Sequence, residues 1–234
     1  MPLDLALGAG LIGIATTAAL ARRERRARTA RQSLLFDDCR DLFEASHVAP
    51  GPDGFPRLDG ILAGHPVRLA AIPDTLTLKR LPQLWLSVTV KREIPVATDF
   101  ALLARANGAE FFSITQRLRV RLELPAPLTG ELLARGSHAD AQEVLDDLAT
   151  PLSMIFADPK VKEAAVTRRG LRLCYQAGEG KRGEHLLLRQ MAFAESRIDP
   201  ETVLTIFDQL LGIEAALRPV QEVSCAMRRT AALG

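Results

Sequence analysis

The sequence predicts an α+β fold, in which an N-terminal transmembrane helix is followed by antiparallel sheet flanked by helices. Three observations predict it. Residues 5–21 carry no charge, several later segments alternate apolar and polar side chains with the period of a strand, and the second half is ordered helix, strand pair, helix. That order favours antiparallel pairing over alternating βαβ units.

Composition excludes several classes of protein. The chain has 234 residues, 47% of them hydrophobic and 25% charged, with a formal net charge of +2. It is too apolar for a disordered chain and too near neutrality for a nucleic-acid coat, and it is long enough to bury a core. Its three cysteines, Cys39, Cys174 and Cys225, are odd in number and far apart. They favour a reducing compartment over a disulfide framework.

Residues 5–21, LALGAGLIGIATTAALA, form the predicted transmembrane helix. At a rise of about 1.5 Å per residue the helix spans roughly 25 Å, just enough to cross a bilayer. Arginines follow the segment and none precede it, so it differs from a secretory signal. The positive-inside rule then predicts a single-pass protein of the inner (plasma) membrane with a cytoplasmic C-terminal domain. The alternative is a buried helix of a soluble domain.

Small residues within this segment allow a second prediction. Ala6 and Gly10, like Ala9 and Gly13, are spaced four apart. Such pairs let two membrane helices approach closely, so a homodimer through the transmembrane helix is a weaker hypothesis.

An arginine cluster follows directly and gives residues 22–31 a net charge of +5. Juxtamembrane basic residues attract anionic lipid at about 1 kcal/mol each, which makes the cluster a candidate lipid contact. The plainer alternative is that the cluster only sets the topology. The chain beyond residue 31 is slightly acidic, which argues against a nucleic-acid partner. The six candidates are Arg22, Arg23, Arg25, Arg26, Arg28 and Arg31.

The helix is expected to continue through residues 32–48 and to end at the proline- and glycine-rich stretch 49–56. Its apolar face would carry Leu35, Cys39, Leu42 and Phe43. Strands are then predicted as a hairpin over residues 58–72, as a strand over 83–90 and as another over 117–124.

The strand over residues 117–124 places Arg117, Arg119 and Arg121 on one face. Three like charges in a row repel one another, so they lie in water, pair with acids, or bind an anionic partner. This row is therefore a candidate anion-binding face.

The second half is predicted to begin with a helix over residues 138–156, started by Ser137 and Asp140 and bent at Pro151. Two strands, 171–176 and 184–194, follow. A final helix starts with Asp199 as N-cap and Pro200 in its first turn.

The elements divide the chain into four predicted parts. Residues 1–31 are the anchor with its arginine cluster, and 32–54 are a membrane-proximal helix and linker. Residues 55–127 form a mostly-β subdomain, and 128–234 form a helix-strand-strand-helix subdomain.

Patterns typical of enzymes and of metal or cofactor sites are weak. The loop GEGKRG, residues 178–183, lacks the Ser or Thr and the following helix of a phosphate loop. The four histidines show no zinc spacing, and acids near His138 suit the start of a helix. No nucleophile motif is present. The sequence therefore predicts no catalytic residue, no metal and no cofactor.

Three segments together resemble a group of uncharacterised bacterial proteins that are single-span at the N-terminus and have no assigned activity. They are residues 55–90, beginning FPRLDGILAGHPVRL, residues 164–176, AAVTRRGLRLCYQ, and residues 182–193, RGEHLLLRQMAF. The resemblance rests on glycines, prolines and apolar alternation over most of residues 55–215. It implies the anchor and an α+β body, and it assigns no catalytic residue.

The leading functional hypothesis is a membrane-tethered cytoplasmic binding or scaffold domain that is not an enzyme and has an unknown protein partner. The first alternative is an enzyme of unrecognised type that acts on a membrane-associated or anionic substrate, with the arginine row and His185 or Arg189 in a cleft. It predicts a concave polar pocket. The second alternative is an anchored carrier of lipid or another small ligand, which requires an apolar cavity between sheet and helix.

Overall fold

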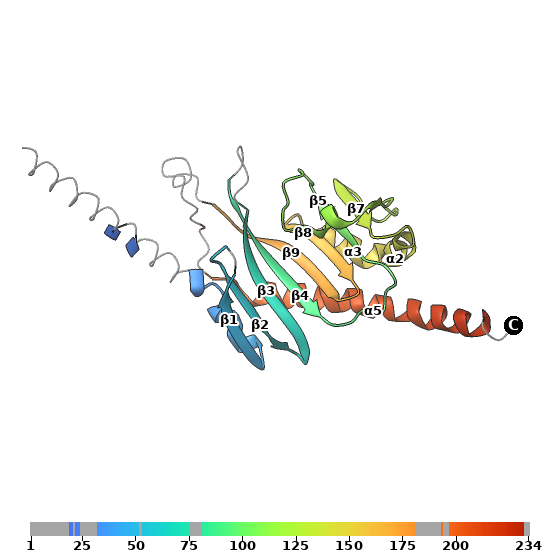
Figure 1. Cartoon of the computed structure of the whole chain (residues 1–234), viewed down its shortest axis with the longest axis horizontal. Coiled ribbons are helices and arrows are strands. Elements are labelled where there is room, and N and C mark those ends of the chain that lie inside the picture. Colours follow the sequence, from blue (N-terminus) through green and yellow to red (C-terminus); the bar gives the residue numbers. More distant parts are fainter. Residues whose placement is uncertain are drawn as a thin grey trace, which may run out of the picture.

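The computed structural model describes residues 19–20, 22–23, 32–51, 53–74, 81–180, 193 and 197–231, with the side chains of the last helix described as far as residue 217. Nine strands and a few helices make up this part of the chain (Figure 1). The strands are β1 (Ala45–Pro50), β2 (Pro56–Leu62), β3 (His65–Asp74), β4 (Gln83–Lys91), β5 (Phe100–Ala104), β6 (Val120–Arg121), β7 (Leu132–Gly136), β8 (Val161–Thr167) and β9 (Gly170–Glu179). The helices are α2 (Ala141–Asp147), α3 (Ala149–Phe156) and α5 (Pro200–Ala231), with the 3-10 helices η1 (Asp37–Leu42) and η2 (Ile114–Arg117).

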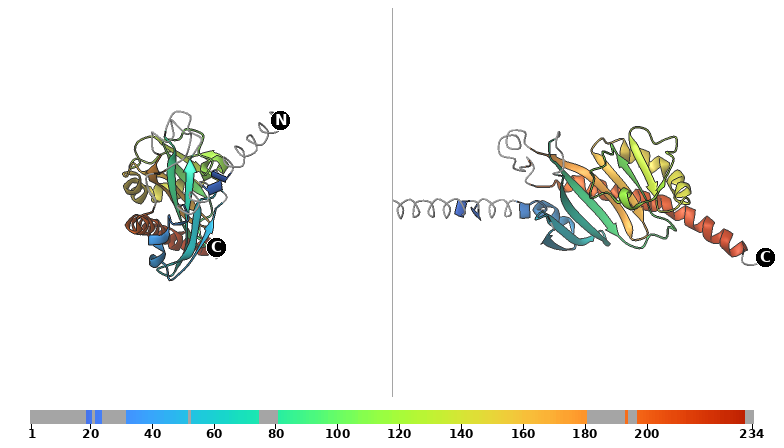
Figure 2. Two further views of the ribbon diagram at one scale, coloured as in Figure 1. Left: turned by 90° about the vertical axis from the view of Figure 1, so that its left-hand side faces the viewer. Right: turned by 45° about the horizontal axis from the view of Figure 1, so that its top comes forward.

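All nine strands belong to one antiparallel sheet with the order β1-β2-β3-β4-β9-β8-β5-β7-β6. The first four strands form a meander, and β9 then pairs with β4. Strands from both sides of the predicted boundary between residues 127 and 128 pair with one another, because β5 lies between β7 and β8. The long strands β3, β4 and β9 lie side by side at the centre of the sheet (Figure 2).

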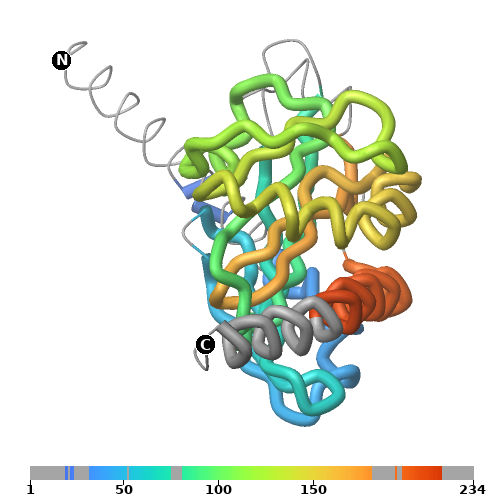
Figure 3. Tube along the Cα trace, turned by 90° about the vertical axis from the view of Figure 1, so that its right-hand side faces the viewer, coloured from blue at the N-terminus to red at the C-terminus, as the bar shows by residue number. Residues whose placement is uncertain are grey.

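The helices α2, α3 and α5 cover one face of the sheet (Figure 3). Alternate side chains of the strands point into this interface and are buried there, as the period of two requires. One register row crosses seven strands and is apolar throughout, and fully burying each leucine of such a row is worth about 1.5–3 kcal/mol. The row consists of Leu58, Leu69, Val88, Leu173, Ala164, Leu102 and Ala134.

Several local predictions are confirmed. The hairpin over residues 58–72 is β2 and β3, joined at Ala63 and Gly64, which both have positive φ. In β4 the even-numbered residues Leu84, Leu86, Val88 and Val90 are buried on one face. The final helix starts at Pro200, and the Asp199 carboxylate accepts a hydrogen bond from the Glu201 N–H.

Other local predictions are wrong, and in each case tertiary contacts decide the structure. The helix predicted over residues 32–48 is replaced by η1 and the edge strand β1, which pairs with β2. Of the strand predicted over residues 117–124, only Val120 and Arg121 pair with a neighbour. The helix predicted over residues 138–156 breaks at Leu148, and Pro151 lies in the first turn of α3, where proline is tolerated.

The predicted fold class is corrected. The described chain is dominated by a single antiparallel sheet with few helices, and none of the described helices is long and apolar enough to cross a membrane. This finding contradicts the predictions of a transmembrane helix, a single-pass architecture and an inner-membrane location. Most of residues 5–21 lie outside the described residues, as do Arg25, Arg26, Arg28 and Arg31 and the strand predicted over 184–194 apart from Phe193.

Candidate functional site

The face of the sheet opposite the helices, called here the open face, is divided into two halves. Over β5 and β8 it is covered by residues 105–119, called here the strap, which lead from β5 towards β6 and include η2. Ile114 and Leu118 of the strap pack on Ala101 of β5 and Ala165 of β8. Over β2, β3 and β4 the open face carries a pocket.

Beneath the strap, charged groups are paired and buried. The Glu163 carboxylate is 0% exposed, accepts hydrogen bonds from the Ser113 hydroxyl at 2.6 Å and from the Ile114 N–H at 2.9 Å, and forms an ion pair with Arg172. Burial alone would lower the pKa of Arg172, but the charge and hydrogen bond of Glu163 help to raise it above its usual value. The Arg172 guanidinium also donates to the Phe112 carbonyl at 3.2 Å, which ties the strap to β9.

A second buried ion pair anchors the start of the strap. Lys162 Nζ lies 2.8 Å from Glu110 Oε1, with side-chain exposures of 6% and 2%, and donates to the carbonyls of Ala104 and Arg105 at 2.8 and 2.9 Å. The Glu110 carboxylate also accepts from the backbone N–H groups of Asn107 and Gly108. Burial would raise the pKa of Glu110, but these hydrogen bonds, the one from Lys162 first, hold it below its usual value.

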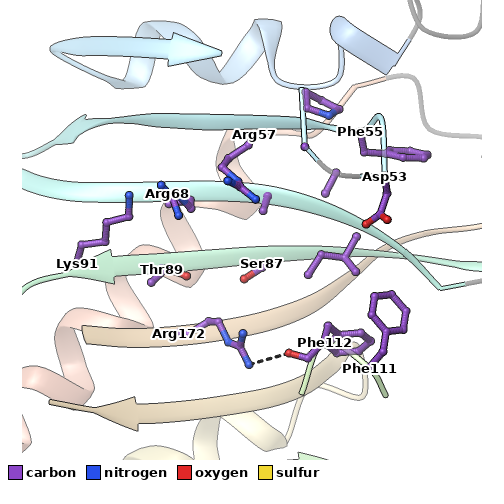
Figure 4. Close-up of a pocket in the computed structure, with 15 residues that line it drawn as sticks. Asp53, Phe55, Arg57, Arg68, Ser87, Thr89, Lys91, Phe111, Phe112 and Arg172 are labelled. Carbon is purple, nitrogen blue, oxygen red and sulfur yellow. Dashed lines mark hydrogen bonds between the residues drawn. The ribbon is translucent and has the colours of Figure 1, made fainter. Parts of the chain in front are cut away.

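The pocket on the other half of the open face has a volume of about 350 Å³ (Figure 4). It is hollow because small side chains, Ala70, Ser87 and Thr89, form its floor between longer ones. Around them lie four basic residues, called here the cationic cluster: Arg57, Arg68, Lys91 and Arg172.

Strand register explains why the cationic cluster converges. Asp59, Arg68, Thr89 and Arg172 are successive partners across β2, β3, β4 and β9. Neighbouring strands lie about 4.8 Å apart, so the backbones of Arg68 and Arg172 are roughly 10 Å apart with the short Thr89 between them. Two arginine side chains can close that gap around one anion.

The cationic cluster is only partly neutralised by protein groups. Asp59 accepts from Arg68 Nε at 2.8 Å and also pairs with Lys91. Burial would raise the pKa of Asp59, but its hydrogen bonds to Arg68 and Lys91 lower it, so the carboxylate is ionised. Arg57 Nε is buried without a hydrogen-bond partner among the described residues. Four cations therefore face two paired carboxylates, Asp59 and Glu163.

The far end of the pocket is aromatic. Phe55 comes from the β1–β2 connection, and Phe111 and Phe112 come from the strap (Figure 4). The rings of Phe111 and Phe112 meet edge to face with centroids 5.6 Å apart, and Phe112 lies 5.9 Å from the Trp85 ring. Asp53 is at this end as well, so the sign of charge reverses along the pocket.

A shallower pocket of about 390 Å³ adjoins the first at Lys91 and reaches the edge strand β1. It is lined mainly by backbone and small or apolar side chains, including Ala45, Ile61 and Pro66. It lacks a cluster of like charge.

The arginines predicted from the sequence lie elsewhere. Arg117, Arg119 and Arg121 are exposed in or beside η2 and β6, at the sheet edge remote from β2 and β3. Arg22 and Arg23 are exposed and lie outside the pocket lining. Whether either set contacts an anion or a lipid stays a prediction.

Sequence reasoning missed all four residues of the cationic cluster. Arg68 and Lys91 alternate with buried apolar residues, which is a signal for an outward strand face. The sequence did not reveal that β9 pairs with β4 and brings Arg172 to the same face.

The two described cysteines are not activated as nucleophiles. Burial first, then Asp38 and Asp199, raise the pKa of Cys39 to about 12, and burial raises that of Cys174 to about 12. Both are therefore thiols and poor nucleophiles at neutral pH. Among the described residues no group of histidine, cysteine and acidic side chains is placed to hold a metal ion. The floor hydroxyls, Ser87 and Thr89, have no described histidine or carboxylate hydrogen-bonded to them.

No protein-family model matches the chain. No curated protein matches it either. Among solved structures, the crystal structure of the mycobacterial trehalose monomycolate transport factor A is similar at 11% identity, over 68% of this chain and 67% of that chain, with a TM-score of 0.36. A likeness of that strength carries no argument about fold or function.

Proposed function

We propose that the described domain is a non-catalytic binding domain that holds an anionic small molecule in the open-face pocket. The observation that carries this proposal is the cationic cluster, whose charge exceeds that of the carboxylates paired with it and whose Arg57 Nε has no described partner. An anion bound among these side chains would offset the surplus positive charge through charge-assisted hydrogen bonds.

Exposure of the cations supports the proposal. The side chains of Arg68 and Lys91 are 37% and 38% exposed, so an incoming anion reaches them from solvent. The Arg172 guanidinium is held in place by its ion pair with Glu163 and its hydrogen bond to the Phe112 carbonyl. A preordered guanidinium loses less side-chain entropy on binding than a free one.

Inorganic phosphate is the first ligand to test, by isothermal titration calorimetry on the full chain. Arg57→Met should weaken binding at least about tenfold, since charge-assisted hydrogen bonds are worth about 1.5–3 kcal/mol. Arg40→Met, which removes the same charge from an exposed position on η1 outside the pocket lining, is the matched control and should bind as the wild type does.

Asp59→Asn tests the same site in the opposite direction. It removes the carboxylate that competes for Arg68 and Lys91 and keeps the shape of the side chain. Phosphate should therefore bind more tightly, and the gain should shrink with added salt. Unchanged affinity in both Arg57→Met and Asp59→Asn would refute the proposed site.

The carrier alternative predicts an apolar cavity between sheet and helix. In the described part of the chain the buried apolar residues of the core lie in that interface, and the two pockets described above lie on the open face. The enzymatic alternative predicts a concave polar pocket that holds the arginine row. The open-face pocket is polar, but Arg117, Arg119 and Arg121 are not among its lining residues. The enzymatic alternative stays a prediction without a favouring observation.

A further inference from the structure

The pocket changes polarity along its length, and this gradient follows the strands. On the open face of β3 the side chains run from Arg68 through Ala70 to Ile72. On β4 they run from Lys91 through Thr89 and Ser87 towards Trp85. In both strands a charged side chain is thus followed by small side chains, which are polar only in β4, and then by a large apolar one.

The apolar end is shaped by groups from outside the sheet. Phe55 lies on one side of this end of the pocket, and Phe111 and Phe112 lie on the other (Figure 4). Phe111 is 48% exposed although it is a large aromatic side chain. Strand geometry makes the distance from Lys91 to the level of Trp85 roughly 20 Å. A bare inorganic anion occupies only one end of such a groove.

Asp53 fixes the direction in which an anionic ligand lies. It is exposed at the aromatic end, where a second negative charge would be repelled. The acidic group of a ligand is therefore favoured at Arg57, Arg68 and Arg172, and its uncharged part is favoured between the phenylalanines.

From this gradient we infer that the ligand is an anionic amphiphile, with one phosphate or carboxylate group joined to an apolar chain or aryl group that lies against Phe55, Phe111 and Phe112. The inference rests on the proposed function and adds the ligand's chemical class. It applies to a monomeric amphiphile, whether that molecule is released from a membrane or made in solution.

Four probes test the inference by calorimetry on the full chain, below their micelle-forming concentrations: inorganic phosphate, butyl phosphate, octyl phosphate and octyl glucoside. Each buried methylene is worth about fourfold in affinity, so octyl phosphate should bind at least about tenfold more tightly than butyl phosphate. Octyl glucoside, with the same chain and no charge, should bind at least about tenfold more weakly than octyl phosphate.

Phe111→Ser should weaken octyl phosphate binding several-fold and leave inorganic phosphate binding unchanged. Because Phe111 is half exposed, the substitution leaves the core intact, and equal thermal melting verifies this. Met154→Ser on α3 removes an apolar side chain that is 67% exposed outside the pocket, and is the matched control.

The outcomes separate this inference from the proposed function. Equal affinity for butyl and octyl phosphate, unaffected by Phe111→Ser, overturns the amphiphile and leaves anion binding standing. Failure of all three phosphates to bind overturns both. Equal binding of octyl glucoside and octyl phosphate also overturns both, because the cationic cluster would then contribute nothing.

Discussion

The two halves of the open face belong to the same sheet, but their charged side chains are arranged differently. Over β5 and β8, the strap covers the face and pairs Lys162 with Glu110 and Arg172 with Glu163. Over β2 to β4 no described segment covers the other three members of the cationic cluster, Arg57, Arg68 and Lys91. Charge on the covered half therefore serves the fold, whereas the surplus on the uncovered half is available to a ligand.

The largest loss of stability should come from breaking a buried ion pair of the covered half. Lys162→Met leaves Glu110 buried without its counter-ion and frees the carbonyls of Ala104 and Arg105. Breaking one partner of a buried ion pair costs about 3–5 kcal/mol. Urea denaturation followed by the fluorescence of Trp85, the one tryptophan of the sequence, measures the loss.

Lys160→Met is the control for that substitution. Lys160 is exposed two residues away and lies over the Tyr175 ring at 5.9 Å. Its loss should cost less than about 1 kcal/mol. A similar cost for both variants would contradict the view that buried charges hold the strap.

The second-largest loss of stability should come from lowering the pH, and it too should arise in the covered half. The pKa of Glu110 is lower in the folded state than its ordinary value of 4.5. Its ionisation therefore stabilises the fold above about pH 4.5, and this contribution is lost as pH falls through the folded-state pKa. Glu110→Gln lacks the contribution and should be less stable at pH 7 by about 1–3 kcal/mol.

Urea midpoints of wild type and Glu110→Gln between pH 7 and pH 3 measure this effect. The gap between the two proteins should narrow as the pH falls below 4.5. A gap that stays constant would show that the Glu110 carboxylate does not titrate with folding.

The smallest effect on stability should come from the uncovered half. Arg57→Met removes a guanidinium whose Nε lacks a described partner, while the side chain's apolar stem is kept. The free energy of unfolding should change by less than about 1 kcal/mol, in either direction. Loss of phosphate binding without loss of stability would sharpen the contrast between the halves, and a loss as large as that of Lys162→Met would remove it.

Local patterns in the sequence predicted the elements whose signal is local. The alternation in β4 and the hairpin at Ala63 and Gly64 depend on neighbours in sequence, as does the start of α5 at Asp199. Residues 117–124, which lead from the end of the strap through β6, were misjudged as one strand because Leu118 and Leu122 do alternate with arginines. Ser113, by contrast, caps η2 and donates to Glu163, a residue fifty positions further along the chain.

Local sequence patterns could not predict the candidate site, because its residues come from distant parts of the chain. Arg68 and Arg172 are more than a hundred residues apart and meet only because β4 pairs with β3 on one side and β9 on the other. Alternation shows that each side chain points outward. It gives no information on which strands are neighbours, so the cationic cluster appears only in the folded sheet.

The pairing of β4 with β9 has a consequence for the protein's synthesis. When Lys91 leaves the ribosome, the meander of β1 to β4 is complete, but the strand that protects its inner edge starts at Gly170. At translation rates of about 5–20 residues per second, that edge waits roughly 4–16 s for its partner. During this interval the edge of β4 exposes backbone N–H and C=O groups that have no partner strand. We therefore expect the nascent chain to bind chaperones at this stage, when aggregation competes with folding.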